Sequence, residues 1–315
     1  ASNMNPRLND FIKNHYPDYK SDFFSAFIVR GSEMTKPEGY CGYFTPYVWM
    51  FIQSYEKLRE YLYSNATIET LIQFEYSAFE EATVPVCTFA FKNSHVSKKG
   101  CYLRLVDFRG GMEVQRQKTL EAIANHDCGF YYEQNTDNFS KIPGSPVAYW
   151  VSNSIYDAFE SGIPLKNFAD LRQGMSTANN DLFLRLWFEV SEDNISYHSE
   201  TTQQAIESKK KWFPHTKGGG ARKWYGNNDY IVNWYNDGEE IRNYPGSAPR
   251  STQYYFREGL SWSTLSSGFI SFRYEPKGFT MNTKGSICYL KKADLQNYIC
   301  GLLDSKPTMS FLELL

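Results

Sequence analysis

The first part of the chain alternates segments of helical hydrophobic spacing with short runs typical of β-strands. Apolar side chains recur at helical spacing from Phe23 to Ile28 and from Phe51 to Leu62, which predicts two amphipathic helices. Strands are predicted between and after them over residues 40–45, 68–74, 84–91 and 101–107, followed by a helix over 113–125. The last two strands are expected to form a hairpin around a Lys-rich turn. This alternation indicates an α/β fold in the order of the second half of a doubly wound sheet, with no first half.

The character of the chain changes from residue 147 on. Residues 129–146 are polar and interrupted by Gly and Pro, so we predict a linker there, between one domain over 1–128 and another over 147–315. In the second domain, short Tyr- and Trp-rich segments alternate with turns of Gly, Asn and Ser. This pattern predicts an α+β domain with long loops and a closing helix over 290–302.

Targeting signals and cysteine motifs are missing, which limits the classes of protein. No apolar run approaches the ~20 residues of a membrane span, and the opening Ala-Ser-Asn-Met is not a charged and then apolar leader. We therefore expect a cytoplasmic protein with no membrane partner. Because the chain does not open with Met, we expect residues upstream of it. The six cysteines contain no C-x-x-C pair, which favours reduced structural thiols over a disulfide scaffold or a zinc site.

Familiar catalytic motifs are absent too. There is no G-x-G-x-x-G, no Walker loop and no G-x-S-x-G, and the five separated histidines are predicted to be surface or hydrogen-bonded residues. Aromatic residues make up 17% of the chain, enough for an aromatic core or for flat surfaces that stack on bases or sugars. The formal net charge of -2 means that any affinity for nucleic acid must come from a local basic patch.

One segment provides such a patch, and we call it the basic-aromatic segment. Its cations alternate with aromatic residues around three consecutive glycines, and they are Lys209, Lys210, Lys211, Lys217, Arg222 and Lys223. This pattern suits contact with a phosphate backbone and splayed bases, and the alternative is a solvated basic loop beside core tryptophans. Residues 172–181 form a turn rich in small donors and acceptors that runs into an expected strand over 182–187. An ordinary hairpin entry is the alternative there.

These features occur together in a known family. The chain resembles, over essentially its whole length, the C-terminal part of the adenine-specific DNA methyltransferase of the BREX phage-defence system, which is similar to type IIG restriction–modification methyltransferases. The likeness is strongest at Ser2-Asn3-Met4-Asn5, Asp22 to Phe27, Lys36-Pro37-Glu38-Gly39 leading to Phe44-Thr45-Pro46, Arg172 to Asp181, and Lys210 to Phe213 through Arg222 to Asn228. The resemblance implies the C-terminal half of a doubly wound class I methyltransferase sheet followed by an α+β target-recognition domain.

The resemblance also implies a chemistry. The family transfers a methyl group from S-adenosylmethionine to the exocyclic N6 of an adenine in double-stranded DNA, with the base flipped out of the duplex into a pocket. The family's Asn-Pro-Pro-Tyr motif and Gly-rich cofactor motif are absent from these 315 residues, and Ala1-Ser2-Asn3 resembles the sequence just downstream of the former. We therefore expect a fragment with an incomplete cofactor pocket and no catalytic residue of its own, inactive alone. Other phage-defence proteins are candidate partners.

The resemblance assigns roles to a few residues. Phe27, with Phe23 one helical turn earlier, matches the position that flanks the adenine ring of the cofactor, and core packing is the alternative for Phe23. Phe79 matches the aromatic residue that packs on the flipped base. The entry to the target-recognition domain, where small residues let the backbone approach DNA, is matched by Gln173, Gly174, Ser176 and Thr177. The cations of the basic-aromatic segment are then expected on a DNA-facing loop.

The main alternative is a stand-alone DNA-binding specificity module that never needed a catalytic half. It predicts a monomer that binds DNA with steep salt dependence, whereas the fragment hypothesis predicts an exposed apolar sheet edge where further strands belong. A carbohydrate-binding protein with Tyr and Trp surfaces is a third hypothesis, which salt-independent binding to glycans would favour.

Overall fold

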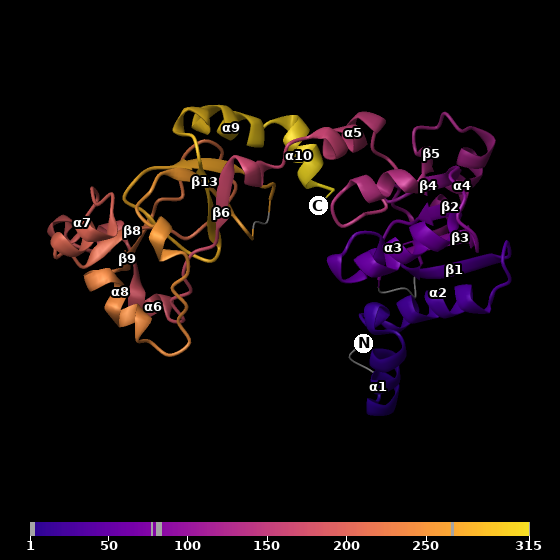
Figure 1. Cartoon of the computed structure of the whole chain (residues 1–315). Helices are drawn as coiled ribbons and strands as arrows, with labels where there is room; N and C mark the ends of the chain where they lie inside the picture. Colours follow the sequence, from indigo (N-terminus) through magenta and orange to yellow (C-terminus); the bar gives the residue numbers. More distant parts are fainter. Residues whose placement is uncertain (1–3, 77, 80–83, 266–267, 315) are drawn as a thin grey trace. The chain divides into compact units, whose positions relative to one another are not determined.

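The structure is a computed structural model, and it describes residues 4–76, 78–79, 84–265 and 268–314. The chain divides into two compact units, which Figure 1 shows: Ala1–Gly162 together with Glu313–Leu315, and Ile163–Leu312. Of the stretches quoted above, residues 1–3 lie outside the described residues. Within the described part of the chain, no helix is both long and apolar enough to cross a membrane.

A five-stranded sheet organises the first unit, in the strand order β1-β3-β2-β4-β5. The bounds are Tyr40–Pro46 for β1, Thr67–Gln73 for β2, Val86–Lys92 for β3, Lys99–Arg104 for β4 and Tyr131–Asn135 for β5. β1 and β2 each pair antiparallel with β3, so these two strands run in the same direction, and β4 is parallel to β2. The sheet is therefore mixed, and the helix that connects β1 to β2 makes a β-α-β crossover.

The helices of this unit are α1 (Pro6–His15), α2 (Phe23–Met34), α3 (Glu56–Asn65), α4 (Gly111–Ala124) and α5 (Asn153–Ser161). The last four contribute buried side chains to the hydrophobic clusters of the sheet, whereas α1 extends away from it (Figure 1). Ile28 of α2 and Leu62 of α3 share one hydrophobic cluster with Phe89 of β3. Ala122 of α4 packs in a separate cluster with Leu103 of β4. The expected alternation of helices and strands is present, and the unit has a mixed α/β fold.

The hairpin expected from residues 84–91 and 101–107 is wrong. β3 and β4 do not pair, because β2 lies between them: Ile72 is opposite Thr88 of β3 and Leu103 of β4. β3 inserts between β1 and β2, so the Lys-rich turn connects strands on either side of β2. The amino-acid composition of the turn does not show that another strand lies between the two strands it connects.

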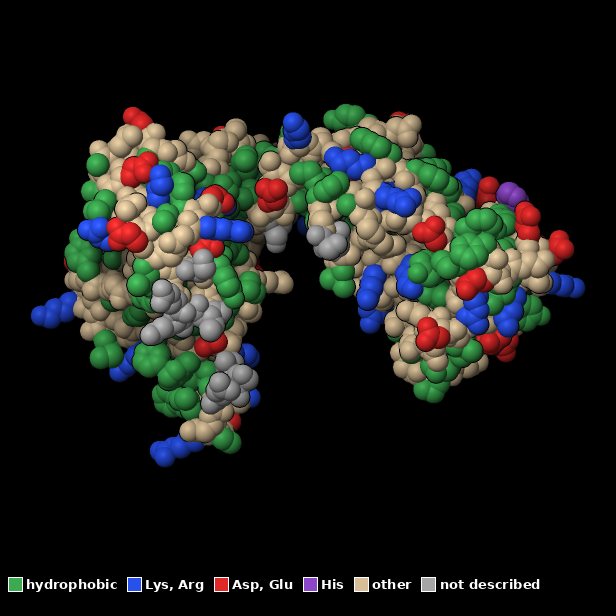
Figure 2. Space-filling view, turned by 180° about the vertical axis from the view of Figure 1, so that it is seen from behind, with side chains coloured by type: hydrophobic (Ala, Val, Ile, Leu, Met, Phe, Trp, Pro, Cys, Tyr) green, Lys and Arg blue, Asp and Glu red, His purple; other side chains and the backbone are tan. Residues whose placement is uncertain are grey.

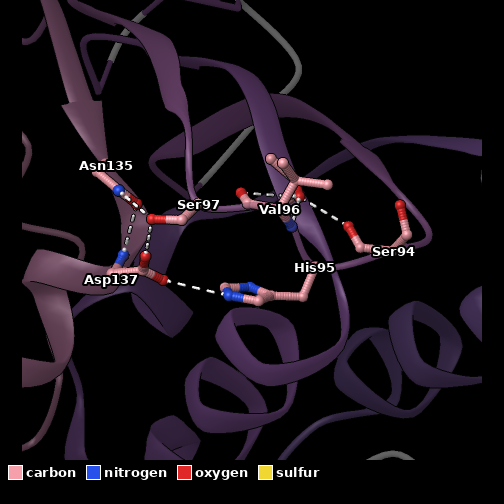
Figure 3. Close-up of polar contacts among 7 residues, drawn as sticks. Ser94, His95, Val96, Ser97, Asn135 and Asp137 are labelled. Carbon is pink, nitrogen blue, oxygen red and sulfur yellow. Dashed lines mark hydrogen bonds and ion pairs between the residues drawn. The ribbon is translucent and has the colours of Figure 1, made fainter.

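Residues 129–146 are not the expected linker, because this segment belongs to the first unit. It contains β5, which pairs antiparallel with β4, and the fully buried Phe139. Figure 3 shows a further attachment, in which Ser97 Oγ donates to Asp137 Oδ2 at 2.5 Å and His95 Nε2 lies 3.5 Å from Asp137 Oδ1. β5 is an edge strand with polar, partly exposed side chains, which gives the segment the composition of a linker. The division between the units falls after Gly162.

Two four-stranded sheets form the second unit, in the orders β11-β10-β13-β6 and β12-β8-β9-β7. Their strands are β6 (Ala169–Arg172), β7 (Leu184–Leu186), β8 (Trp212–Thr216), β9 (Tyr230–Asn233), β10 (Gly259–Ser263), β11 (Phe272–Glu275), β12 (Thr280–Met281) and β13 (Gly285–Leu290). The helices are short: α6 (Asn180–Phe183), α7 (Thr202–Glu207), α8 (Tyr235–Arg242), α9 (Gln296–Leu303) and α10 (Lys306–Leu312). The closing helix begins later than expected, since residue 290 still belongs to β13.

Candidate nucleic-acid interface and aromatic pockets

A polar pocket in the second unit collects part of the predicted DNA-binding surface. Its volume is about 230 Å³, and its lining residues are Ser176, Thr177, Ala178, Asn180, Lys217, Asn282, Thr283 and Lys284. They come from the turn after β6 and the start of α6, from the residue that follows β8, and from the connection between β12 and β13. The lining contains two lysines and no carboxylate, so the pocket is suited to an anion.

The two lysines of this pocket differ in what surrounds their ammonium groups. Lys217 Nζ lies 4.0 Å from the centroid of the Tyr230 ring, a cation–π contact. Lys284 is exposed, and its backbone is fixed by a hydrogen bond from its N–H to Asn282 Oδ1 at 3.1 Å. Neither ammonium group forms an ion pair with a carboxylate in the described ranges, so both charges are available to a ligand. Lys284 carried no signal in the sequence, because it stands alone between Thr283 and Gly285.

The four predicted residues of the 173–177 turn have different roles. Gly174 is buried, and a Cβ at this position would overlap the carbonyl oxygen of Met281, so the glycine permits close packing inside the unit. Thr177 is 2% exposed and donates to Asn180 Oδ1 at 2.7 Å. Ser176 pairs through its backbone with Ala248. These three residues shape the turn, and Ser176 and Thr177 also line the polar pocket.

Gln173 is exposed and sits between two neighbours. Its Nε2 donates to the carbonyl oxygen of Thr283 at 3.1 Å, and its Oε1 accepts a hydrogen bond from Arg250 Nη1 at 3.1 Å. The side chain thereby ties the turn to the β12–β13 connection that carries Lys284. Gln173 remains a predicted DNA contact.

The structure does not gather all cations of the basic-aromatic segment in one place. Lys211 Nζ lies 3.9 Å from Glu240 Oε1, and Lys210 Nζ donates to the carbonyl oxygen of Asp193. Lys223 Nζ donates to the carbonyl oxygen of Asp304 at 2.7 Å. Lys209 and Arg222 are exposed. Of the six predicted cations, Lys217 is the one that lines the polar pocket.

His215, in the same segment, has a structural role. It is fully buried, its Nδ1 lies 2.9 Å from Thr280 Oγ1, and its Nε2 lies 3.3 Å from Asn282 Nδ2. Burial and, as the smaller cause, the nearby charge of Lys217 lower the pKa of His215 to about 3. The neutral ring therefore fixes β12 and Asn282 beneath the polar pocket.

In the first unit, Phe23 and Phe27 form an edge-to-face pair with ring centroids 4.5 Å apart. They line an apolar pocket of about 190 Å³ between α1 and α2, together with Phe11, Ile12, Tyr16, Ala26 and Arg30. The Phe27 ring is 53% exposed. Phe27 can therefore offer a flat face to a ligand, whereas Phe23 serves both the pair and the pocket wall.

Phe79 lies in a second aromatic pocket of the first unit. Its ring meets Phe44 of β1 and Phe74 edge-on, at centroid distances of 5.1 and 5.2 Å, and it is half-buried. The pocket has a volume of about 490 Å³, and Met112 and Leu120 of α4 lie on its wall. The ring is neither enclosed in the core nor free on the surface. It can contact a flat ligand that enters this pocket.

Other groups in the described residues do not form a further reactive centre. Asp137 lies between Ser97 and His95, so the histidine cannot act as base for the serine hydroxyl as in a catalytic triad. The six cysteines are free, and no cluster of metal-ligating side chains occurs in the part of the chain that the structure describes. Hydrophobic side chains are also found at the surface of both units, beside Lys and Arg side chains (Figure 2).

Comparisons with known proteins find relatives of this chain among DNA-modifying enzymes. Residues 1–79 match the family described as Eco57I restriction-modification methylase. The chain is 38% identical to the adenine-specific methyltransferase PglX of Lacticaseibacillus casei (strain Zhang), over all of this chain and 27% of that protein. It is 33% identical to the adenine-specific methyltransferase BrxX of Escherichia coli O9:H4 (strain HS), over 92% of this chain and 23% of that protein. The resemblance to the BREX adenine methyltransferases is confirmed.

The chain spans about a quarter of the length of these PglX and BrxX relatives. Among solved structures, the Type IIL restriction-modification enzyme MmeI in complex with DNA is similar in fold, with a TM-score of 0.51 and 15% identity. That similarity covers 96% of this chain and 41% of the MmeI chain. The type IIG restriction endonuclease BpuSI matches with a TM-score of 0.40 and 10% identity, over 96% of this chain and 42% of that chain.

Proposed function

We propose that the chain is part of an adenine-specific DNA methyltransferase that moves a methyl group from S-adenosylmethionine to adenine N6 in phage defence. The observation that carries the proposal is the 38% identity to the PglX methyltransferase over the whole chain. In this proposal the first unit is the C-terminal part of the catalytic domain, and the second unit is the target-recognition domain.

The chain alone is proposed to be inactive. The Asn-Pro-Pro-Tyr motif and the Gly-rich cofactor motif are absent from its sequence. The sheet of the first unit supports the same conclusion, because no described strand pairs with the outer edge of β1. Tyr40 and Phe44 on that strand are 67% and 55% exposed. Apolar side chains on an open strand edge favour a partner segment that completes the sheet.

A methyl-transfer assay tests this proposal. Duplex DNA and S-adenosylmethionine with a labelled methyl group are incubated with the complete protein and, separately, with this chain. We expect label in N6-methyladenine with the complete protein and none with the chain. Label in another base would contradict the adenine-N6 activity, and robust transfer by the chain alone would contradict its inactivity.

The cofactor is proposed to contact the first unit through Phe23 and Phe27. An exposed ring beside an apolar pocket fits one face of the adenine moiety, and the pocket lining has no carboxylate that could hold the ribose hydroxyls. S-adenosylmethionine supplies the methyl group, while these two residues would bind and orient its adenine. The groups that hold the ribose would then lie elsewhere in the complete protein.

The target base is proposed to meet Phe79. The half-buried ring at the wall of an apolar pocket supports this role, because a flipped base can lie against such a ring. Phe44 and Phe74 hold the Phe79 ring in place through edge-to-face contacts.

The second unit is proposed to bind duplex DNA through the polar pocket and the basic-aromatic segment. Two lysines without carboxylate partners line that pocket, and DNA phosphates are the anions that lysines in such a setting would bind. The division of the chain into two compact units keeps one alternative open, a DNA-binding specificity module without catalysis. The methyl-transfer assay with the complete protein distinguishes the two.

A further inference from the structure

Two large aromatic side chains stand exposed in the middle of the basic-aromatic segment. Trp224 is 55% exposed and Tyr225 is 62% exposed. Burying such rings would normally stabilise a fold, so their exposure needs another explanation. Neither residue lines a described pocket, and neither belongs to a hydrophobic core cluster of the described residues.

The backbone at Trp224 is strained. Its φ angle is 74°, in the left-handed region that large side chains rarely adopt. Such strain persists only when the surrounding structure enforces it, and it is concentrated at functional sites. Here β11 enforces it: Trp224 N–H donates to the carbonyl oxygen of Phe272 at 3.0 Å, and Tyr274 N–H donates to the carbonyl oxygen of Trp224 at 2.8 Å.

Further hydrogen bonds fix the residues on both sides of the two rings. Ser271 Oγ accepts from the backbone N–H of Arg222 at 2.9 Å, and Lys223 Nζ donates to the carbonyl oxygen of Asp304. On the other side, the buried Asn227 donates from Nδ2 to the carbonyl oxygen of Gly220 at 2.9 Å. The rings are therefore presented to solvent on a fixed loop, and ordering that loop adds little to the entropic cost of binding.

The charge around the rings selects the ligand. From residue 209 to residue 226 the chain contains six cations and no Asp or Glu. The Arg222 side chain crosses the loop beside the rings, since a Cβ built on Gly226 would lie 3.0 Å from its Cδ. Arg222 forms no ion pair with a described carboxylate. Flat rings beside the unpaired Arg222 match single-stranded nucleic acid, in which bases stack on aromatic residues and phosphates meet cations.

We propose that Trp224 and Tyr225 form a stacking platform for an unpaired nucleobase, with Arg222 at the adjoining phosphate. This inference rests on the proposed DNA binding of the second unit and adds the kind of contact made there. The base that stacks on the platform is then one that has become unstacked where the duplex is opened.

Binding of a single-stranded oligothymidine to the full chain, measured by fluorescence anisotropy at low and high salt, tests the platform. Trp224→Ala is expected to weaken binding about tenfold or more, by a similar factor at both salt concentrations, because stacking does not release counterions. Arg222→Ala is expected to lower the salt dependence instead. The matched control is Trp187→Ala, which removes a 50% exposed tryptophan beside Phe188 and should leave binding unchanged.

A second variant separates stacking from folding. Glycine adopts positive φ without strain, so Trp224→Gly is expected to melt at the same or a higher temperature than the wild type and still to lose binding. Normal affinity of Trp224→Ala and Trp224→Gly would overturn the platform alone. Failure of the wild-type chain to bind any DNA, single-stranded or duplex, would overturn the proposed DNA binding and the platform with it.

Discussion

At the scale of single residues, Phe79 is the side chain whose proposed role differs most from ordinary packing. Phe79→Ala in the complete protein is expected to slow methylation by about tenfold or more, because base stacking is worth ~1–3 kcal/mol. Duplex affinity should change little, since the ring meets only a base that has left the helix. Single-turnover methylation and duplex binding, measured side by side, test this difference.

Phe79→Trp serves as the control, because it keeps a flat ring at the same position. It should retain most of the methylation rate. A loss of duplex affinity as large as the loss of rate in Phe79→Ala would contradict the stacking role.

Glu275 is a second informative residue, because it is almost completely buried beside Arg273. Burial raises the pKa of Glu275 to about 7, against the opposing effects of Thr216, Ser261 and Arg273. Between the ordinary value of 4.5 and about 7, the folded state binds the proton that the unfolded state has lost. Folding stability contributed by this group therefore falls as pH rises through that window.

Glu275→Gln, which resembles the protonated acid, is expected to unfold at higher denaturant concentration than the wild type at pH 8. The difference in unfolding free energy should shrink by up to about 1.4 kcal/mol per pH unit as pH falls towards 4.5. Taking the difference cancels the opposite contribution of His215, whose lowered pKa removes stability as pH falls below its ordinary range. A difference that stays constant from pH 8 to pH 4.5 would contradict the buried, titrating Glu275.

At the scale of elements, Arg59 of α3 explains why residues 129–146 are not a linker. Its side chain is fully buried, and it donates to the carbonyl oxygens of Trp49, Ile52 and Gly144 at 2.6 to 3.0 Å. Burial lowers the pKa of this guanidinium, and the carbonyl partners compensate for lost hydration. One side chain thus fastens the segment after β5 to α3.

Arg59→Met is expected to lower the free energy of unfolding of the first unit by about 3 kcal/mol or more, because several buried carbonyl groups lose their donor. Lys57→Met on the same helix is the matched control, since Lys57 is exposed and should change stability by less than about 0.5 kcal/mol. Denaturant unfolding of both variants provides the measurement. Equal losses in the two variants would show that Arg59 is not an anchor.

The sequence predicted elements well where hydrophobic periodicity is strong. α2 and β1 were found close to their expected positions, because each buries one regular face. α3 begins at Glu56, five residues later than expected. β5 was missed, since its partly exposed polar side chains resemble a loop. The pairing of β2 between β3 and β4 depends on long-range contacts, which local turn composition does not encode.

The same limit applies to the candidate site. The basic-aromatic segment was visible as a run of cations and rings, and Lys217 indeed lines the polar pocket. Lys284 was not visible, because it reaches the pocket from a distant turn. Gly174 was assigned to backbone approach to DNA, whereas its lack of a Cβ is already required by the carbonyl group of Met281.

At the scale of the whole molecule, the chain consists of two compact units. It spans about a quarter of the length of its PglX and BrxX relatives. The first unit carries both aromatic pockets, and the second carries the polar pocket and the exposed rings. This separation fits a division of labour in which one unit holds cofactor and base while the other holds the DNA backbone. Such a division predicts that loss of DNA affinity and loss of chemistry arise from different residues.

The most direct measurement is the affinity of this chain for duplex DNA over a range of salt concentrations, with Lys217→Ala, Lys284→Ala and Lys292→Ala beside the wild type. Lys284 directly precedes β13 and Lys292 is the second residue after it, which corresponds to about 26 Å of extended chain, so Lys292 is a matched control outside the polar pocket. We expect steeply salt-dependent binding, and a slope lowered by about 1 for each pocket variant but not for Lys292→Ala. Salt-independent binding, or equal effects of all three variants, would contradict a DNA-binding surface centred on this pocket.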